Sequence, residues 1–447
     1  MANKLYRESA VQNIADAIRQ KNGLSSIYKV SQMAQAVLDL RTSGIELITS
    51  SQRNNLTEIS SSDFTTVGDC AFASCLNLTT AEFPECSTIG FFAFNGCSKL
   101  SSISFPKCKT IKAYAFSQCN SLINVSFPEV TDLGNSVFAS CLNLEVVNFS
   151  KCTSVVSGDF INCSKLSYVN FPLASSIGSS AFMNCTSLQD VSFPTCTSIG
   201  DNAFNFCYSL TTINFSVCTT VGQSAFQSCS SLTLISFPKC TTIGIYAFTR
   251  CSNLTTVSFP ECTSIGSFAF GYCSSLTSIS FPECTSIGSY AFQRCSNLTS
   301  ISFPVCTSIG NYAFSSCSSL TSISFPVCTS IGGAAFQNCS SLTSISFPEC
   351  VSIGSHAFVT CTNLTTVSFP KCTSIGSNAF TNCSRLSQLY IGTSNCSLVN
   401  SNAFYATPFE YSIYLGYFGS IYVPSAYVSW YKSATNWVHY SSRIVGY

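Results

Sequence analysis

The sequence of 447 residues has little charge: Lys, Arg, Asp and Glu make up 9% of it, and the formal net charge is +1. Because no basic field is available to attract a phosphate backbone, we expect no nucleic-acid partner. Hydrophobic residues alternate with Ser and Thr and never reach the run of about 18 apolar residues that a transmembrane helix needs, which predicts no membrane insertion. The N-terminal segment MANKLYRE lacks the apolar stretch of a secretory signal peptide.

Histidine is scarce, since the chain has only His356 and His439. Neither is spaced from an acid and a nucleophile as a catalytic triad requires, so we expect a non-enzymatic protein without catalytic residues. The C-x2-C pairs typical of zinc sites are also missing, and cysteines that project in parallel from stacked coils do not converge tetrahedrally on an ion. The sequence therefore predicts no metal site and no cofactor.

Cysteine, by contrast, is abundant and periodic. Fifteen of the 29 cysteines recur every 22 residues from Cys75 to Cys383, and twelve more form a second series from Cys86 to Cys372. Such a fixed period is typical of a solenoid, in which each unit buries its apolar face against its neighbours. Equivalent residues on adjacent coils lie about 4.8 Å apart, so geometry alone does not exclude disulfides. Val130 and Ala174 replace cysteine as small apolar residues would, which favours buried, reduced thiols.

One repeat unit begins at Leu276. Leu276, Ile279 and Phe281 follow an L-x-x-L-x-L spacing, in which the last two alternate as the inward positions of a strand do. Pro282 ends the strand because it cannot donate to the next rung, and Gly288 permits a tight or left-handed turn. The residues that follow are predicted to form a short helix or a single helical turn, with Ala, Phe and Cys side chains inward.

The pattern L-x-x-I-x-F-P-x-C-x-x-I-G-x-x-A-F-x-x-C runs with few departures from Leu78 to Cys383. It resembles the leucine-rich repeats of the BspA-like kind, which occur in bacterial surface adhesins, protist surface proteins and phage tail-associated proteins. The resemblance implies an α/β solenoid with a parallel β-sheet on one face and short helical turns on the other. Leucines at the first repeat position, from Leu56 to Leu386, predict a leucine-rich repeat stack of about sixteen 22-residue coils. Repeats of this class share a scaffold and differ in ligand, so function must be sought on the surface.

Composition divides the chain into three parts. Residues 1–45 are predicted as an N-terminal helical hairpin, because apolar residues recur on one face before a break at Gly23. This hairpin is either a cap or an attachment module, since its sequence is similar to a segment that precedes varied C-terminal modules in phage tail and prophage proteins. The leucine-rich repeat solenoid is expected over residues 46–407. Residues 408–447 are expected to form an aromatic C-terminal cap, with sugar stacking as the alternative role of its aromatics.

Two variable repeat positions carry unusual residues in consecutive coils. The first position is aromatic in four coils, and the second, four residues further along, holds arginine or tyrosine, which i,i+4 spacing on a helical turn would place beside the first. The candidate ligand-binding residues are Tyr246, Phe268, Tyr290 and Tyr312 at the first position, and Arg250, Tyr272 and Arg294 at the second. Aromatics and arginine dominate binding hot spots, which favours a binding patch. The alternative is an inert ladder in which the rings stack and arginine lies over Tyr272. Phe92 and Tyr114 form a smaller cluster of the same kind.

Three functions are compatible with these features. The leading hypothesis is a recognition or adhesion protein that presents its repeat surface to a cell-surface protein or glycan, for example as a phage tail-associated receptor-binding protein. The alternatives are a purely structural spacer and an intracellular protein-binding scaffold. The expected location is a virion or the cell surface, with the N-terminal segment attaching the chain to a larger assembly. Ser and Thr ladders on the strand face are explained by β propensity and hydroxyl bonding, so they are not a candidate site.

Overall fold

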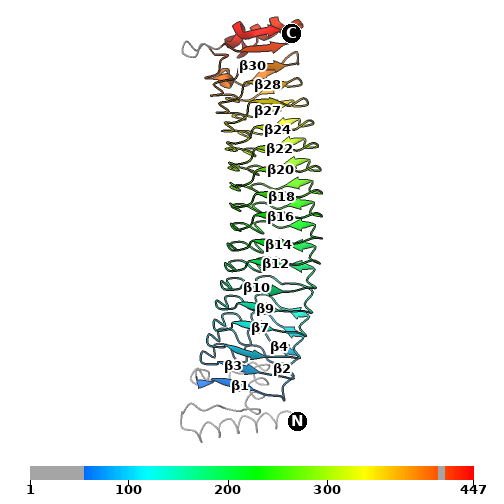
Figure 1. Cartoon of the computed structure of the whole chain (residues 1–447), viewed down its shortest axis with the longest axis vertical. Helices are drawn as coiled ribbons and strands as arrows, with labels where there is room; N and C mark the ends of the chain where they lie inside the picture. Colours follow the sequence, from blue (N-terminus) through cyan, green and yellow to red (C-terminus); the bar gives the residue numbers. More distant parts are fainter. Residues whose placement is uncertain (1–54, 411–417) are drawn as a thin grey trace. The chain divides into compact units, whose positions relative to one another are not determined.

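The computed structural model describes residues 55–410 and 418–447. The helical hairpin predicted for residues 1–45 lies outside the described residues. The described residues belong to two compact units, the first ending at Phe215 and the second beginning at Ser216. Both units are built from stacked coils with strands at regular intervals, and each unit is described by itself (Figure 1).

In the first unit, a typical coil contributes a strand of three residues and then a strand of two. The three-residue strands are β1 (Glu58–Ser60), β3 (Thr80–Glu82), β5 (Ser102–Ser104), β7 (Asn124–Ser126), β9 (Val146–Asn148), β10 (Tyr168–Asn170), β12 (Asp190–Ser192) and β14 (Thr212–Asn214). The two-residue strands are β2 (Thr66–Val67), β4 (Thr88–Ile89), β6 (Thr110–Ile111), β8 (Asp132–Leu133), β11 (Ser176–Ile177) and β13 (Ser198–Ile199). Between β9 and β10 the two-residue strand is reduced to an isolated bridge from Val155 to Ile177.

The second unit repeats this arrangement with greater regularity. Its longer strands are β16 (Leu234–Ser236), β18 (Thr256–Ser258), β20 (Ser278–Ser280), β22 (Ser300–Ser302), β24 (Ser322–Ser324), β26 (Ser344–Ser346), β28 (Thr366–Phe369), β30 (Gln388–Ile391) and β32 (Ser420–Val423). Its two-residue strands are β15 (Thr220–Val221), β17 (Thr242–Ile243), β19 (Ser264–Ile265), β21 (Ser286–Ile287), β23 (Ser308–Ile309), β25 (Ser330–Ile331), β27 (Ser352–Ile353), β29 (Ser374–Ile375) and β31 (Ser397–Leu398). The chain closes with η1 (Ser401–Phe404), η2 (Ser425–Tyr427), α4 (Val428–Ser433), η3 (Trp437–Arg443) and β33 (Ile444–Gly446).

The strands pair in parallel, and the repeat sets their register. Ile279 of β20 lies opposite Ile301 of β22, and Ile287 of β21 lies opposite Ile309 of β23, each pair 22 residues apart. The predicted parallel leucine-rich repeat solenoid is thereby confirmed. The described residues contain seventeen coil strands of three or four residues, from β1 to β32. This is one more than the sixteen predicted coils, because β32 pairs with β30 as an additional strand.

Two columns of phenylalanine run through the interior of the coils. In the second unit, the ring of Phe281 stacks on that of Phe303 with centroids 5.5 Å apart, and Phe292 stacks on Phe314 at 5.2 Å. Phe281 and Phe292 of the same coil meet at an interplanar angle of 58°. Phe281 and Phe292 each stack on the equivalent ring of the next coil and meet one another at a tilt, an arrangement favourable for aromatic pairs.

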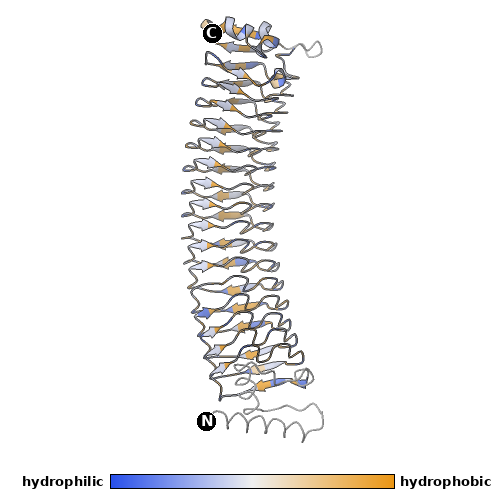
Figure 2. Ribbon diagram, turned by 180° about the vertical axis from the view of Figure 1, so that it is seen from behind, coloured by the Kyte–Doolittle hydropathy of each residue, from blue (hydrophilic) through white to orange (hydrophobic). Residues whose placement is uncertain are grey.

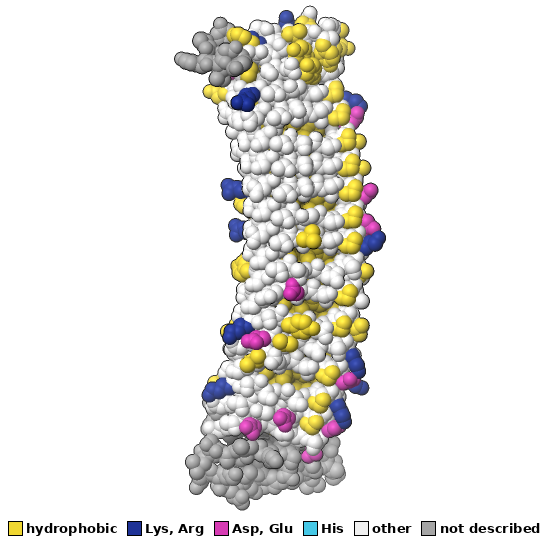
Figure 3. All heavy atoms as spheres, in the orientation of Figure 1, with side chains coloured by type: hydrophobic (Ala, Val, Ile, Leu, Met, Phe, Trp, Pro, Cys, Tyr) yellow, Lys and Arg dark blue, Asp and Glu magenta, His cyan; other side chains and the backbone are white. Residues whose placement is uncertain are grey.

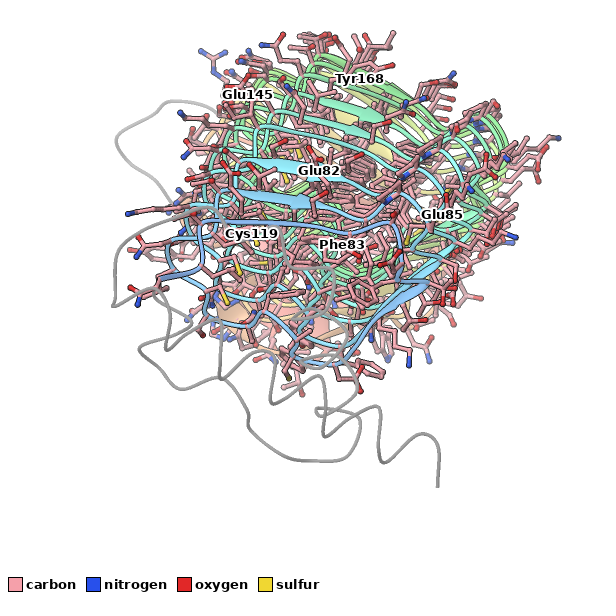
Figure 4. All side chains as sticks on the ribbon, turned by 90° about the horizontal axis from the view of Figure 1, so that it is seen from below. Glu82, Phe83, Glu85, Cys119, Glu145 and Tyr168 are labelled. Carbon is pink, nitrogen blue, oxygen red and sulfur yellow. The ribbon has the colours of Figure 1, made fainter. Side chains whose placement is uncertain are left out.

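Strand residues alternate between this interior and solvent. In β20 the central Ile279 is buried and the serines on both sides are exposed. Hydrophobic and hydrophilic residues accordingly alternate along the strands in Figure 2. The end-on view of Figure 4 shows Phe83 and Cys119 inside the coils of the first unit, whereas Glu145 and Tyr168 lie at the outer edge.

The cysteines are buried hydrogen-bond donors. None of the 29 forms a disulfide, and all but the half-buried Cys70 are buried. In one column the Cys295 thiol donates to the carbonyl oxygen of Phe270 at 3.2 Å, and in the other the Cys284 thiol donates to that of Ser286 at 3.2 Å. Burial raises the pKa of the Cys284 thiol to about 12. These side chains are therefore neutral, compact core residues at physiological pH.

The segment predicted as a short helical turn has a different hydrogen-bond pattern. The N–H groups of Ala291, Gln293 and Cys295 donate to carbonyls three residues earlier, so the segment is a series of tight turns and not an α-helix. The intervening N–H of Phe292 donates instead to Ala313 of the next coil at 2.8 Å. This alternation gives the turn face its own ladder between coils, which a helix would forgo because its N–H groups bond within the helix.

Aromatic residues of the C-terminal segment cover the last coils. Tyr431 and Trp437 are buried. The Tyr431 hydroxyl donates to the Thr393 carbonyl at 2.9 Å, and the Trp437 indole N–H donates to the Cys396 carbonyl at 2.7 Å. Burial also raises the pKa of Tyr440 to about 12. These contacts show that the buried aromatics of this segment pack against the solenoid.

Candidate functional site

The four aromatics predicted at the first variable position form one continuous stack in the second unit. Tyr246 and Phe268 have ring centroids 4.9 Å apart, Phe268 and Tyr290 4.4 Å, and Tyr290 and Tyr312 4.7 Å. Interplanar angles of 16°, 5° and 4° make the rings nearly parallel. All four side chains are half-buried. We call these residues the aromatic column.

The three residues at the second variable position also contact one another. The guanidinium carbon of Arg250 lies 5.8 Å from the Tyr272 ring centroid, and that of Arg294 lies 5.4 Å from it. Both distances are within the range of a cation–π contact. Tyr272 is half-buried and both arginines are exposed. We call these residues the arginine–tyrosine column.

The contacts run along each column, from coil to coil. The i,i+4 neighbour relationship expected on a helical turn is therefore not what assembles the site, because the segment is not an α-helix. Stacking across the 22-residue period brings the predicted residues together instead. The seven candidate residues thus form two ladders on the turn face. One ladder has the ring stacking, and the other the cation–π contacts, that are expected of a structural ladder without a ligand.

Both columns occupy left-handed backbone positions. The φ angles are 57° at Phe268, 60° at Tyr290, 63° at Arg250 and 59° at Arg294. An L-residue pays about 1–2 kcal/mol for this conformation, and bulky residues adopt it rarely. Other coils place better-suited residues at the same two positions: Gly158, Asn202 and Asn378 at the first, and Gly96, Asn184 and Asn338 at the second.

The ladder between coils holds this backbone in place. Tyr290 N–H donates to the Asn311 carbonyl and Arg294 N–H to the Ser315 carbonyl, both at 2.8 Å. The turns begin at Gly288, where a Cβ atom would lie 2.6 Å from the carbonyl carbon of Gly266 in the preceding coil. Only glycine fits at such a distance without movement of the backbone. The turn geometry is therefore set by coil-to-coil contacts and is independent of which side chain occupies the two columns.

Stacking leaves only part of each aromatic ring accessible. Within the aromatic column, the faces of Phe268 and Tyr290 are covered by the rings of neighbouring coils. Ser224 and Ala334 occupy the equivalent positions beyond the two ends. The surface offered to a ligand therefore consists of ring edges and tyrosine hydroxyls along the column, with ring faces at its ends.

The first unit holds a smaller version of this arrangement. Phe92 and Tyr114 stack at 4.9 Å with an interplanar angle of 4°, and each is 39% exposed. Phe91 and Lys112 were not predicted from the sequence, yet the Lys112 ammonium group lies 4.9 Å from the Phe91 ring centroid. The available signal was Lys112 itself, since it replaces the glycine of the repeat.

The strand face carries hydroxyl ladders that the protein itself uses. Thr299 donates through its hydroxyl to the Thr277 carbonyl at 3.0 Å, and Thr321 donates to the Thr299 carbonyl at 3.1 Å. On the face drawn in Figure 3, most of the surface is uncharged and polar, and charged side chains are few. Internal hydrogen bonding accounts for these threonines without a ligand, as predicted from the sequence.

The described residues contain no other obvious reactive centre. His356 and His439 are exposed, and the ring Nε2 of His356 lies 3.1 Å from the side-chain amide nitrogen of Asn378. No group of three or more His, Cys, Asp and Glu residues in the described ranges could hold a metal ion. A helix long and apolar enough to cross a membrane is likewise missing from the described part of the chain.

The repeats, the parallel ladders and the turn face together define a leucine-rich repeat solenoid. A family model described as "BspA type Leucine rich repeat region (6 copies)" matches the chain in overlapping segments: residues 49–167, 153–276, 219–327, 241–352 and 307–421. The chain belongs to this family of BspA-type leucine-rich repeat proteins.

One solved structure agrees with this assignment, and a second is given for comparison. A leucine-rich repeat protein from Bacteroides ovatus is 26% identical, with a TM-score of 0.63 over 76% of this chain and 88% of that one. A leucine-rich cell surface protein from Faecalibacterium prausnitzii is 24% identical over 78% of this chain and 86% of that one, with a TM-score of 0.36. No curated protein matches the chain.

Proposed function

We propose that this protein is a non-enzymatic recognition protein and that the aromatic and arginine–tyrosine columns of the second unit contact its ligand. One observation carries the proposal. Bulky aromatic and arginine side chains occupy left-handed positions in consecutive coils, although serine, asparagine and glycine meet the same backbone requirement elsewhere in the chain. Because the left-handed backbone recurs at these positions throughout the described coils, the unusual feature is the bulky residue type and not the backbone itself. Aromatic and arginine side chains are also the residues that contribute most at binding interfaces.

The proposed ligand is a cell-surface protein or glycan. The exposed arginines and the tyrosine hydroxyls supply hydrogen-bond donors, and the ring edges supply apolar contact. We further propose that the protein acts on a virion or at a cell surface, because BspA-like repeats, which it resembles, occur in surface adhesins and phage tail-associated proteins. Tail and lysis genes beside its gene would support the virion, whereas sortase or export genes would support a cell surface.

The test removes the centre of the aromatic column through the double substitution Phe268→Ser and Tyr290→Ser. Serine occupies this position at Ser136, Ser180 and Ser224 with φ angles of 57°, 57° and 53°, so the backbone accepts it. Binding of the purified full chain to bacterial cells and to a glycan array is then compared with the parent. We expect binding to fall at least tenfold, as loss of a hot-spot pair would cause.

A matched control is available in the first unit. Phe92→Ser with Tyr114→Ser removes a stacked aromatic pair of nearly the same geometry at the same repeat position. This control should bind like the parent. Equal binding by all three proteins, with unchanged thermal stability, would reject the columns as the recognition site.

A structural spacer is the second candidate function, and the stacking itself favours it. Ring faces that cover one another stabilise neighbouring coils, at about 0.5–1.5 kcal/mol for each aromatic pair. Under this alternative, the Phe268→Ser and Tyr290→Ser variant would lose thermal stability and keep its binding. An intracellular protein-binding scaffold remains the third hypothesis, with the same columns as its contact surface.

A further inference from the structure

The arginine–tyrosine column presents two cations without acidic partners. Arg250 and Arg294 form neither an ion pair nor a side-chain hydrogen bond within the described residues. The ion pairs that the structure does contain join a lysine to a glutamate on the adjacent coil, as in Lys239 and Glu261 at 2.5 Å. Charge neutralisation therefore takes place at another repeat position, the one after the repeat proline, and leaves the two arginines uncompensated.

Tyr272 belongs to the coil between the coils of these two cations. Arg250 belongs to the coil before Tyr272 and Arg294 to the coil after it, so the guanidinium groups flank the ring from its two neighbouring coils. Their distances to the ring centroid, 5.8 Å and 5.4 Å, limit the separation of the two guanidinium carbons to about 11 Å. Ser228 and Ser316 occupy the same position in the next coils outward, which confines the positive charge to this pair.

Stacking on an aromatic ring leaves a guanidinium group able to bind anions. A guanidinium group that contacts a ring through its flat face keeps its N–H donors free, because they lie in the plane of the group. Carboxylate and phosphate oxygens accept such donors in pairs, and these charge-assisted bonds are stronger than neutral ones. Two guanidiniums no more than about 11 Å apart therefore suit a ligand that carries oxyanions at intervals.

We propose that Arg250 and Arg294 bind an anionic glycopolymer, a chain in which carboxylate or phosphate groups recur between neutral, hydroxyl-bearing units. The guanidiniums bind two oxyanions, and the hydroxyls and ring edges of the aromatic column, four residues earlier in the same turns, contact the neutral units. This inference rests on the proposed function, because it names the ligand class for the same surface. Carboxylate and phosphate polymers both offer oxyanions to the guanidinium donors. The two anionic probes described below distinguish them.

The test uses the full chain with Arg250→Gln and Arg294→Gln, and three probes: oligogalacturonate, an oligomer of glycerol phosphate, and neutral dextran. The control variant, Arg385→Gln with Lys432→Gln, removes two exposed cations elsewhere in the second unit. We expect the parent and the control to bind at least one anionic probe and not dextran, with affinity falling as salt increases. The arginine variant should bind that probe at least tenfold more weakly, because it loses both charge-assisted contacts.

The outcomes separate this inference from the proposed function. Binding of the arginine variant equal to that of the control, or a parent that binds neither anionic probe, would overturn the anionic glycopolymer. Should Phe268→Ser with Tyr290→Ser still abolish binding to cells in that case, the recognition surface stands and only its ligand class is wrong. A preference for one anionic probe over the other identifies carboxylate or phosphate as the group recognised.

Discussion

Outward strand positions vary from coil to coil in the first unit, whereas in much of the second unit they hold only Ser and Thr. Glu82 in β3, Val146 in β9, Tyr168 in β10 and Asp190 in β12 all replace the usual hydroxyl residue. From β18 to β28, the first and third residues of every longer strand are Ser or Thr. The second unit varies instead at its turns, where aromatics and arginines gather. Outward positions on both the strand face and the turn face therefore tolerate variation. Packing alone does not explain why the aromatic column consists of aromatic residues.

The interiors of the two units differ much less than their surfaces. Phenylalanine, cysteine and leucine columns are buried in both. One exception is the coil of Asp159 in the first unit, where this acid replaces a buried alanine and is itself fully buried. Its carboxylate accepts a hydrogen bond from Val156 N–H at 2.7 Å. This coil is also the one in which the two-residue strand shrinks to a bridge.

The largest expected effect tests whether the two interiors are equivalent. Phe182 in the first unit and Phe292 in the second occupy the same column, and both are fully buried. Replacing either by alanine should lower the free energy of unfolding by about 3–5 kcal/mol, because each substitution leaves a cavity among close-packed rings. Denaturant unfolding of the two single variants measures the cost. A near-zero cost at either site would mean that the rings there do not form the core.

Gly288→Ala is expected to have a smaller but clear effect. The added Cβ would lie 2.6 Å from Gly266 carbonyl carbon, so neighbouring coils must separate locally. Overpacking of this kind costs about 1–3 kcal/mol. In the first unit Lys112 already occupies the equivalent position, so Lys112→Ala should cost less, about 0.5–1 kcal/mol from the lost contact with Phe91. Equal losses in the two thermal denaturation experiments would show that the first unit does not relax around this column.

Asp159 predicts a pH dependence that belongs to the first unit. Burial raises the pKa of this carboxyl well above its usual range. The folded chain therefore retains a proton that the unfolded chain releases above pH of about 4, and the free energy of unfolding falls as pH rises from there toward the folded pKa. Asp159→Asn removes this titration. Relative to the parent, the variant should become steadily more stable from pH 4 to pH 7, by no more than about 4 kcal/mol, because one proton changes the free energy by about 1.4 kcal/mol per pH unit.

The control for this measurement is Asp159→Ala, which restores the alanine of the repeat at this position. Asp159→Ala should show the same change with pH relative to the parent, because it also removes the carboxyl group. If Asp159→Asn kept a constant difference from the parent across this pH range, the carboxyl would have to be solvated or ionised in the folded protein, contrary to its buried position.

The sequence predicts the coils well because the repeat imposes one solution on all of them. Once the 22-residue period is known, the inward direction of Ile279 and the stacking of Phe268 on Tyr290 both follow from periodicity. The left-handed φ angles of Phe268 and Tyr290 cannot be predicted from the periodicity, because neither Phe nor Tyr indicates a left-handed turn as Gly or Asn would. Coil-to-coil hydrogen bonds select that backbone, and a single coil read alone contains no trace of them.

The ion pairs between coils were likewise not predicted from the sequence, because each pair joins residues on different coils. Glu85 and Lys107 bond at 2.6 Å across 22 residues, and Glu349 and Lys371 do the same. These pairs become visible in the sequence only when equivalent positions are compared between coils. They are exposed and should contribute little to stability, but they reveal that the arginines of the candidate site lack such partners.

The last prediction concerns two exposed apolar residues on the strand side of the first unit, where substitution should have little effect. Ile123 and Tyr168 are exposed on the strand side of the first unit, at 46% and 54%, and would be a rival recognition surface if strand variation marks ligand binding. Replacing both by threonine restores the residue type common in the second unit. Stability should change by less than about 0.5 kcal/mol, because threonine is well suited to an exposed strand and no buried contact is lost. Binding to cells should match the parent. A tenfold loss of binding by this variant, with Phe268→Ser and Tyr290→Ser binding normally, would move the recognition site from the turns of the second unit to the strands of the first.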